Sequence, residues 1–415
     1  MSRASLDAAR AARLARLAWI AVGVYLIALG IAAVFRTQGD FNIYYRAGAR
    51  VLQGETIYRL DESNHFLYAP IFAIFFAPFA ALPMRAAQFG WYLVSAVSIV
   101  ALIIGSSRML FGRKHRLEAA LIVVPIILSA RFINNNIEHG QINLPTLALA
   151  VWAIILGEED RGVISGAMLA AAMLIKPFAI LAALFLLLER KWQPILFSIV
   201  FGIVLMLAPM AVFGIRGTID QTAAYLQVVG SMTDRYTLMI TDQSASSAIA
   251  RLMSLGANPG ATPSHLALYA GTGLELAIIA AVVIWFLRGG ESIARDSRPH
   301  RFQLAALFCI MPSMVPISWK SYYAALLIPY MLLTFVLWSG RPVNTPTPTA
   351  TIALVAVSVV LNWISGNRAN HFALFFSAHF LSSVILMLAI FAGSRWWQAC
   401  GNGRLTQAGT VNNTA

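Results

Sequence analysis

The sequence predicts an all-α protein that crosses a membrane many times, and three observations carry this prediction. Hydrophobic residues make up 59% of the 415 residues and charged residues only 11%, and the mean hydropathy is +0.73. Apolar runs of the length that spans a bilayer recur along the chain. Clusters of Lys and Arg lie in short segments between these runs, as is typical of cytoplasmic loops. We therefore expect one membrane-embedded domain over residues 1–415.

The first apolar run, at 17–35, follows a basic amino terminus at 1–16. No small-residue cleavage site follows it, so we interpret the run as a retained anchor rather than a signal peptide. Eleven more runs suit a crossing, which makes about twelve and places both chain ends in the cytoplasm. The segment 394–415 then forms a cytoplasmic tail. The further runs are 86–111, 117–132, 143–157, 162–175, 177–188, 194–213, 266–287, 302–315, 322–338, 349–365 and 373–393.

The stretch 66–83 is also apolar, but Pro70, Pro78 and Pro83 interrupt it. If it lies in the interface, the basic clusters of the chain all fall on the cytoplasmic side. If it crosses, the amino-terminal cluster is opposed to the others. We therefore expect this stretch to lie on the membrane surface, within a first external loop over 36–85. A second large external loop is expected over 214–265.

Residues 162–188 fit two arrangements, a single helix kinked at Lys176-Pro177 or two short helices that meet there. Charged residues flank both ends of the stretch, at 158–161 and 189–191. This suggests that both ends face the cytoplasm. We therefore expect a hairpin with Lys176 at its external tip.

The external segments combine a carboxylate, several cations and many amide and tyrosine side chains. The carboxylate is Asp40, directly after the first apolar run, where an acid is costly to keep unless it works or is paired. Such a mixture suits a lipid-linked phosphosugar, because cations hold a phosphate, amides and tyrosines hold sugar hydroxyls, and a carboxylate accepts a proton from an attacking hydroxyl. The candidate phosphate ligands are Lys176, Lys320 and Arg131. The candidate sugar or acceptor ligands are Tyr44, Tyr45, Tyr68, Gln141, Asn143, Gln243, Trp319 and Tyr322.

Several of these residues also have a simpler interpretation. Asp40 could be a solvated loop acid, or the ion-pair partner of Arg36 or Arg46. Lys176 could extend its amine to the water interface, and Arg131 could anchor the outer end of its helix. The tyrosines near loop ends are also what an aromatic belt predicts.

The sequence shows no motif typical of a metal, nucleotide or nucleic-acid site. The seven histidines follow no metal-ligand spacing, and the glycine loops that hold nucleotide phosphates are absent. We therefore expect no cofactor and no soluble nucleotide-sugar donor. The net charge of +13 is explained by cytoplasmic Lys and Arg at anionic lipid, so membrane lipid rather than nucleic acid is the expected partner. Neither Cys309 nor Cys400 belongs to a disulfide framework.

A set of short segments in order over about 36–330 carries a family resemblance. The segment 40–48 begins with Asp-Phe-Asn and contains Tyr45-Arg46-Ala47, and Gly54…Tyr58 and Tyr68-Ala69-Pro70 follow it. This resembles the first external loop of glycosyltransferase family 87, which has an aspartate, Tyr-x-Ala, Gly-x-x-x-Tyr and Tyr-x-Pro. The further matching segments are Gly140-Gln141-Ile142-Asn143, Ile175-Lys176-Pro177, Asp242-Gln243-Ser244 and Val315-Pro316-Ile317-Ser318-Trp319.

The resemblance implies a membrane-embedded enzyme of the GT-C fold, whose first external loop lies on the membrane as short helices and carries the catalytic aspartate. It implies that Asp40 is the general base, that a polyprenyl-phosphate-linked sugar is the donor, and that a glycolipid or glycan is the acceptor. Two positions depart from the family pattern. Ser321, beside Lys320, stands where many members have histidine, and Asp242 stands where asparagine is common.

The expected function is therefore transfer of a sugar, first of all mannose, from polyprenyl phosphate to an acceptor hydroxyl. The transfer would occur with inversion on the external side of the inner membrane. An arabinofuranosyl or other pentosyl donor is the alternative within the same class. A transporter or flippase of lipid-linked sugar is the alternative in another class. Transporters gather polar groups near the membrane midplane in repeated halves, and neither feature is visible in this sequence.

Overall fold

The structure is a computed structural model, and it describes residues 3–36, 38–62, 64–254, 264–290, 298–315, 317–339, 345–364 and 367–411. Within these ranges the regular secondary structure is helical throughout. The elements are α1 (Arg3–Phe35), α2 (Gly39–Gln53), α3 (Pro70–Ala80), α4 (Met84–Phe111), α5 (Ala119–His139), α6 (Asn143–Glu158), α7 (Gly162–Ile175), η1 (Pro177–Ala179), α8 (Ile180–Leu188), α9 (Trp192–Leu207), α10 (Met210–Thr237), α11 (Ala245–Met253), α12 (His265–Leu287), α13 (Arg301–Ile310), η2 (Met311–Ser313), η3 (Lys320–Leu326), α14 (Leu327–Ser339), α15 (Thr347–Trp363), α16 (Asn367–Phe375) and α17 (Ala378–Val411).

Helix length and composition confirm a polytopic membrane protein. Among the described residues, six helices are long and apolar enough to cross a bilayer, or up to eight if each of two bent helix pairs is one span. Several of the expected twelve crossings are shorter helices. The 16 residues of α6, for example, extend about 24 Å, against a hydrocarbon core of about 30 Å. Helix length alone therefore gives a smaller number of crossings than the apolar runs predicted.

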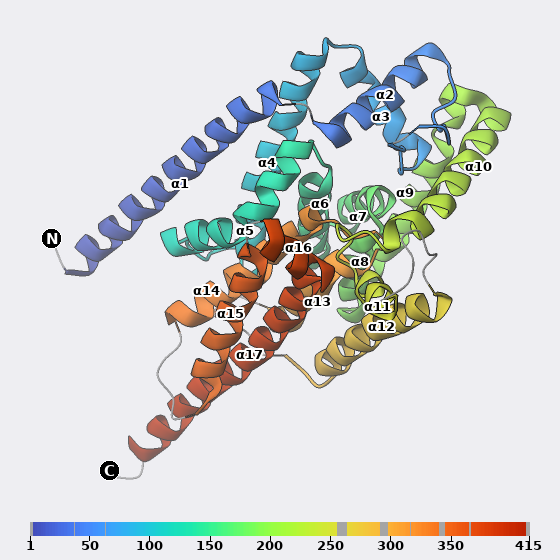
Figure 1. Ribbon diagram of the computed structural model, residues 1–415. Helices are drawn as coiled ribbons and strands as arrows, with labels where there is room; N and C mark the ends of the chain where they lie inside the picture. Colours follow the sequence, from blue (N-terminus) through green and yellow to red (C-terminus); the bar gives the residue numbers. More distant parts are fainter. Residues whose placement is uncertain are drawn as a thin grey trace.

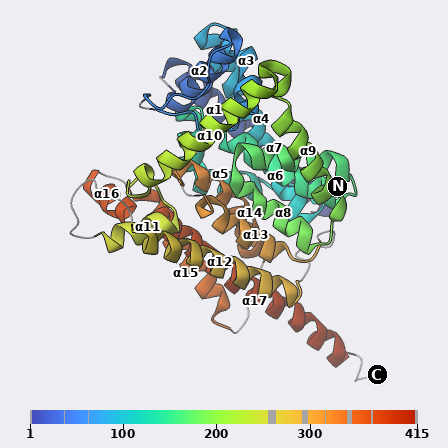
Figure 2. The same cartoon turned by 90° about the vertical axis from the view of Figure 1, so that its right-hand side faces the viewer.

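The beginning of α1 and the end of α17 lie on the same side of the molecule, and the loop between α2 and α3 lies away from them (Figure 1). Helices α1 and α17 both extend toward this side, whereas α2, α3 and α10 gather at the other end (Figures 1 and 2). A hydrogen bond from the Ile57 amide to Gln221 Oε1, 3.1 Å long, joins the loop after α2 to α10.

Helix α2 packs its apolar face against α3. Phe41, Tyr44 and Ala47, spaced by three residues, are all buried, as one face of an amphipathic helix requires. The ring of Phe41 contacts Phe76 of α3 at 5.6 Å between centroids. Gly48 lies against the backbone of Phe76, where an added Cβ would come within 2.8 Å. The two helices therefore pack at close range and form one unit.

Helix α3 has 11 residues and is about 16 Å long, too short to cross a bilayer. Pro70 is its first residue, where a missing amide N–H costs nothing. Pro78 lies near its end, and Pro83 directly precedes α4. The prolines thus divide the apolar stretch 66–83 into a short helix and two connections.

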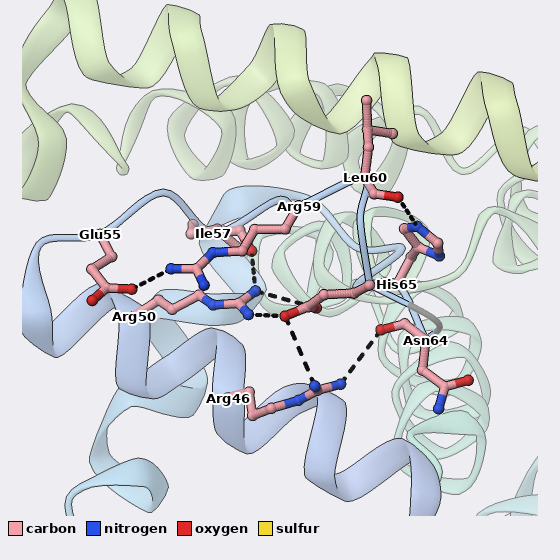
Figure 3. Close-up of polar contacts among 9 residues, drawn as sticks. Arg46, Arg50, Glu55, Ile57, Arg59, Leu60, Asn64 and His65 are labelled. Carbon is pink, nitrogen blue, oxygen red and sulfur yellow. Dashed lines mark hydrogen bonds and ion pairs between the residues drawn. The ribbon is translucent and has the colours of Figure 1, made fainter.

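The loop between α2 and α3 is held by arginines of α2 (Figure 3). Arg50 is buried, donates a 2.8 Å hydrogen bond to the Ile57 carbonyl and pairs with Glu62. Arg46 lies 3.8 Å from Glu62 and donates to the Asn64 carbonyl. These contacts fold the loop back on α2 and place Asn64 beside the cavity described below.

Helices α7 and α8 form the expected hairpin. Gly157 lies in the last turn of α6. A Cβ added there would lie nearest to atoms of Ser165 near the start of α7, Leu186 near the end of α8, and Pro194. In addition, Asp160 before α7 pairs with Lys191 after α8 at 2.8 Å. Both ends of the stretch therefore lie together, and Lys176 occupies the turn at the other end.

Several helices continue beyond the apolar runs from which the crossings were predicted. Helix α5 continues to His139 rather than ending near residue 132, so Asn134–Asn136 are helical. The expected loop 214–265 contains most of α10 and all of α11. Helix α17 continues to Val411, through most of the expected tail. Polar residues do not stop a helix. In α5 the stop is Gly140, which takes the left-handed conformation at φ 68°.

Candidate active site

A cavity of about 580 Å³ lies at the end of the molecule formed by α2, α5, α10 and the tip of the α7–α8 hairpin. It is also lined by the segment 315–322 and by α16. Nine of the twelve candidate residues line this one cavity, although they come from distant parts of the sequence. They are Asp40, Tyr44, Tyr68, Arg131, Gln141, Lys176, Trp319, Lys320 and Tyr322.

Asp40 lies in the first turn of α2, and its carboxylate is held by a glutamine. Gln141 Nε2 donates to Asp40 Oδ2 at 2.6 Å. The Gln141 amide is itself oriented by Asn143, whose Nδ2 lies 2.7 Å from Gln141 Oε1. Since the Gln141 oxygen faces a donor, its N–H group faces Asp40. The left-handed turn at Gly140 directs the chain from α5 to this position.

The simpler interpretation of Asp40 as the partner of a nearby arginine is wrong. Arg36 pairs with Glu138 at 3.0 Å, and Arg46 pairs with Glu62. Burial raises the pKa of Asp40 above its usual range, and the Gln141 hydrogen bond and the positive charge of Lys176 oppose this increase. Asp40 is therefore a half-buried carboxylate at a cavity wall, with a pKa closer to neutrality than that of a surface aspartate.

The Lys176 amine points into the cavity among aromatic rings. It donates a hydrogen bond to the Tyr322 hydroxyl and lies 4.4 Å from the centre of the Tyr322 ring and 4.8 Å from that of Tyr68. The hydroxyl groups of Tyr68 and Tyr44 form a 2.9 Å hydrogen bond with each other. The amine therefore does not extend to bulk water. Instead, it forms a polar cluster with three hydroxyl groups beside Asp40.

Arg131 lines the cavity, but most of its N–H groups form hydrogen bonds with other residues of the protein. Its Nη1 donates to the carbonyls of Asn362 at 2.6 Å and Ile364 at 2.8 Å, and its Nη2 donates to Asn370 Oδ1 at 2.7 Å. These bonds connect α5 to the end of α15 and to α16. Arg131 thus fixes one wall of the cavity, which weakens its candidacy as a phosphate ligand.

Lys320 and Trp319 offer donors that the described residues leave unused. Lys320 is the first residue of η3 and lines the cavity; no hydrogen bond or ion pair joins its amine to another described side chain. Trp319 Nε1 is buried and has no hydrogen-bond partner within the described ranges. A buried indole N–H without a partner is costly, so both groups are available to a ligand. Pro316, part of the same expected turn, lies outside the described residues.

Three candidates lie outside the cavity and support it from behind. Tyr45 turns its hydroxyl to the Leu82 carbonyl at 2.8 Å. Asn143 is buried beneath Gln141 and also lies 3.1 Å from Ser321 Oγ. Gln243 is buried and donates to the carbonyls of Ile240 and Leu374. The cavity lining therefore does not include these three residues. Sequence spacing does not show which way a side chain points.

Sequence reasoning missed the role of Asp242. Its Oδ1 accepts the backbone N–H groups of Ser244 at 2.9 Å and Ser318 at 3.0 Å, and the Gln243 amide donates to the Ser318 carbonyl at 2.7 Å. This pairing clamps the segment that precedes Trp319 and Lys320. Burial raises the pKa of Asp242 to about 7. Its carboxylate does not line the cavity, so it supports the wall through the segment that it holds.

The cavity also has lining residues that the sequence did not single out, among them Asn64, His65, Asn135 and His139. His139 is the last residue of α5, and its charge lowers the pKa of Asp40. Its place two residues before Gln141 is the one signal from which the sequence could have identified it.

The chain is similar to proteins of a known family. The profile of glycosyltransferase family 87 matches residues 66–318, well over half of the chain. A polyprenol-phosphate-mannose-dependent alpha-(1-2)-phosphatidylinositol mannoside mannosyltransferase from Mycolicibacterium smegmatis is 27% identical over 331 residues, covering 72% of this chain and 70% of that protein. A protein of the same description from Mycobacterium tuberculosis is 27% identical over 384 residues, covering 84% of this chain and 81% of its own length.

The matched range begins after Asp40 and ends before Trp319, so it includes Tyr68, Gln141 and Lys176 but not the carboxylate. The order of segments, the membrane helices and the relatives point the same way. The chain belongs to glycosyltransferase family 87 and is a membrane glycosyltransferase.

Proposed function

We propose that this enzyme transfers mannose from a polyprenyl phosphate to a hydroxyl of a glycolipid, with Asp40 as the general base. The Asp40 carboxylate, held by Gln141 on the wall of the cavity that also contains Lys176, is the observation that carries the proposal. The curated relatives support the donor class, since they are described as polyprenol-phosphate-mannose-dependent. Their described substrate, a phosphatidylinositol mannoside, supports a glycolipid acceptor.

The proposed reaction is a single displacement with inversion. The acceptor oxygen forms a bond to the anomeric carbon while the bond from that carbon to the phosphate oxygen breaks. The acceptor proton passes to Asp40. A carboxylate whose pKa is raised accepts a proton readily. The phosphate leaves with both electrons of the broken bond and needs no acid.

Cationic and hydroxyl groups of the cavity would hold the leaving phosphate. Lys176 presents its amine beside Tyr68 and Tyr322, and Lys320 and the Trp319 indole have donors free for a ligand. Hydrogen bonds to a phosphate in a site shielded from water strengthen as negative charge develops on it. The tyrosines and Gln141 would then contact sugar hydroxyls. Arg131 would form part of the cavity wall.

We place this cavity on the external side of the inner membrane, within a GT-C fold of one domain. The basic clusters at 113–116 and 190–191 lie at the opposite ends of the helices that reach the cavity, and such clusters face the cytoplasm. The 36–85 loop then lies on the outer surface, supported by the short α3. Short helices such as α6 and α7 could complete about twelve crossings where the bilayer thins.

Reconstitution tests the reaction class and the donor together. Purified protein in liposomes, supplied with a mannosylated phosphatidylinositol, should release polyprenyl phosphate from polyprenyl-phosphate-mannose and yield an acceptor one mannose heavier by mass spectrometry. Parallel liposomes with polyprenyl-phosphate-arabinose test the pentosyl alternative. Turnover of the arabinose donor alone would contradict the assignment of mannose, and turnover of neither donor would contradict the donor class.

A further inference from the structure

A second, smaller cavity lies at the far end of the same helices. Its volume is about 210 Å³, and it lies between the ends of α4 and α6 and the start of α13. Helix α6 begins at Asn143, beside the first cavity, and ends at Glu158 on the second. Fifteen residues of helix separate them, about 22 Å. Six charged residues line the small cavity: Arg108, Arg113, Glu158, Glu159, Arg298 and Arg301.

The arginines outnumber the acids of this cavity. Arg108 Nε donates to Glu159 at 3.1 Å, and Arg301 Nη2 lies 2.7 Å from Glu158, so these four residues form two neutral pairs. Glu189 lies close enough to Arg301 to be affected by its charge but does not line the cavity. The two arginines not included in these pairs give the lining a positive charge.

Those two arginines occupy different positions at the edge of the cavity. Arg298 is exposed and donates a hydrogen bond to the Glu158 backbone carbonyl. Arg113 is also exposed, in the segment after α4, and no ion pair joins it to an acid among the described residues. Both can therefore contact a ligand that enters from solvent or from the lipid surface.

Arg301 is the residue that points to a ligand. Its side chain is 1% exposed, yet Nε and Nη1 have no hydrogen-bond partner within the described part of the chain. Buried guanidinium donors without hydrogen-bond partners are expensive, because their hydration is lost. The guanidinium also lies over the Phe185 ring, with Cζ 5.9 Å from the ring centre. Arg301 is also the first residue of α13, so the amino end of a ten-residue helix lies at this cavity, and such an end attracts anions.

We propose that this cavity binds a phosphate group, carried either by a membrane phospholipid or by a soluble anion. Planar guanidinium groups bind phosphate oxygens in pairs, and a buried arginine with free donors beside two exposed arginines fits that chemistry. The simpler account is an ion-pair network that ties three helix ends together and binds nothing. This proposal is independent of the transfer reaction, and its test does not use enzyme activity.

The test uses the full-length protein in nanodiscs of phosphatidylcholine alone, at constant ionic strength. Inorganic phosphate is titrated, and binding is measured from the melting temperature and from the phosphorus-31 NMR linewidth. A second set of nanodiscs contains phosphatidylglycerol, and native mass spectrometry counts the retained lipid. The variants are Arg113→Gln and Arg298→Gln, which are exposed and leave both ion pairs intact. Arg116→Gln is the matched control, since it is an exposed arginine near Arg113 that does not line the cavity.

We expect saturable binding by the wild type and by Arg116→Gln, weakened about 10-fold or more in Arg113→Gln and Arg298→Gln. Such binding of inorganic phosphate in phosphatidylcholine identifies a soluble anion. Retention of phosphatidylglycerol that the two variants lose identifies a headgroup. The proposal is overturned if the wild type binds neither probe, or if Arg116→Gln weakens binding as much as the two cavity variants.

Discussion

Gln141 donates its side-chain N–H to Asp40 across 2.6 Å. This contact joins the segment that follows α5 and Gly140 to the first turn of α2. These two residues are 101 positions apart in the sequence. The contact places the carboxylate on the cavity wall, and Asn143 fixes the direction of the donor. The proposed proton transfer depends on this pair more than on any other contact.

Replacing Gln141 by Ala should slow transfer and move its pH dependence. A hydrogen bond to a charged carboxylate is worth about 1.5–3 kcal/mol, so we expect a loss of roughly 10- to 100-fold. The hydrogen bond lowers the pKa of Asp40; its removal raises that pKa further. The acid limb of the rate profile, where Asp40 gains a proton and cannot act as a base, should therefore move to higher pH. Gln53→Ala, at the exposed end of α2, is the control, and an unmoved acid limb in Gln141→Ala would contradict the link.

Removing the positive charge of Lys176 should weaken the hold on the donor phosphate. Lys176→Met retains most of the packing against Tyr68 and Tyr322 but removes the charge. We expect activity with the polyprenyl-phosphate donor to fall about 10-fold or more. Lys320→Met should show a loss in the same direction, and Lys114→Met, in an exposed segment far from the cavity, should show none. Full activity of both cavity variants would show that the phosphate is held elsewhere, with Arg131 next to test.

Asp242 should make the stability of the protein depend on pH. Burial raises its pKa to about 7, whereas an unfolded chain has an aspartate pKa of about 3.9. Between these values the folded state binds the extra proton, so this residue destabilises the fold progressively as pH rises from about 4 through 7. Asp242→Asn should therefore raise the melting temperature at pH 8 and change it little at pH 4. The exposed Asp220→Asn should change it at neither, and an equal effect of Asp242→Asn at both pH values would contradict the assignment.

A methyl group at Gly48 should separate α2 from α3. The Cβ of Gly48→Ala would meet the Phe76 backbone at 2.8 Å, and overpacking of this kind typically costs about 1–3 kcal/mol. Thermal unfolding in detergent should show the loss, together with reduced activity because Asp40 lies on α2. Gly230→Ala, where an added Cβ meets nothing within 4 Å, should be neutral or slightly stabilising. Equal stability of the two variants would show that α2 is not held in this way.

The sequence predicted which residues gather but not how each is used. Charge, apolar runs and short segments were enough to bring Asp40, Lys176 and Trp319 to one end of the molecule, because helix direction alternates along a membrane chain. The same reasoning also placed Gln243 in the site, although its amide turns away to the Leu374 carbonyl. Side-chain direction depends on helix rotation and on long-range partners, and neither is visible in spacing.

The ends of the helices could not be predicted from the apolar runs for a related reason. The apolar run of α5 ends near residue 132, but its backbone hydrogen bonds continue to His139 because nothing before Gly140 breaks them. Polar residues such as Asn136 then face inward, where Asn136 donates to the Ser321 carbonyl at 2.8 Å. Likewise, the clamp by Asp242 is made to backbone N–H groups, which no motif encodes.

The replacement of Asp40 by Asn tests the central claim most directly. The Asn side chain keeps the size and a hydrogen-bond acceptor for Gln141, but it cannot take a proton from the acceptor hydroxyl. The matched control is Asp61→Asn, the same change at an exposed position of the loop between α2 and α3. With polyprenyl-phosphate-mannose and a glycolipid acceptor in liposomes, we expect Asp40→Asn to fold normally and lose at least ~10²-fold in turnover. Asp61→Asn should keep wild-type turnover. Turnover by Asp40→Asn within a few fold of the control would contradict the role of Asp40 as the base.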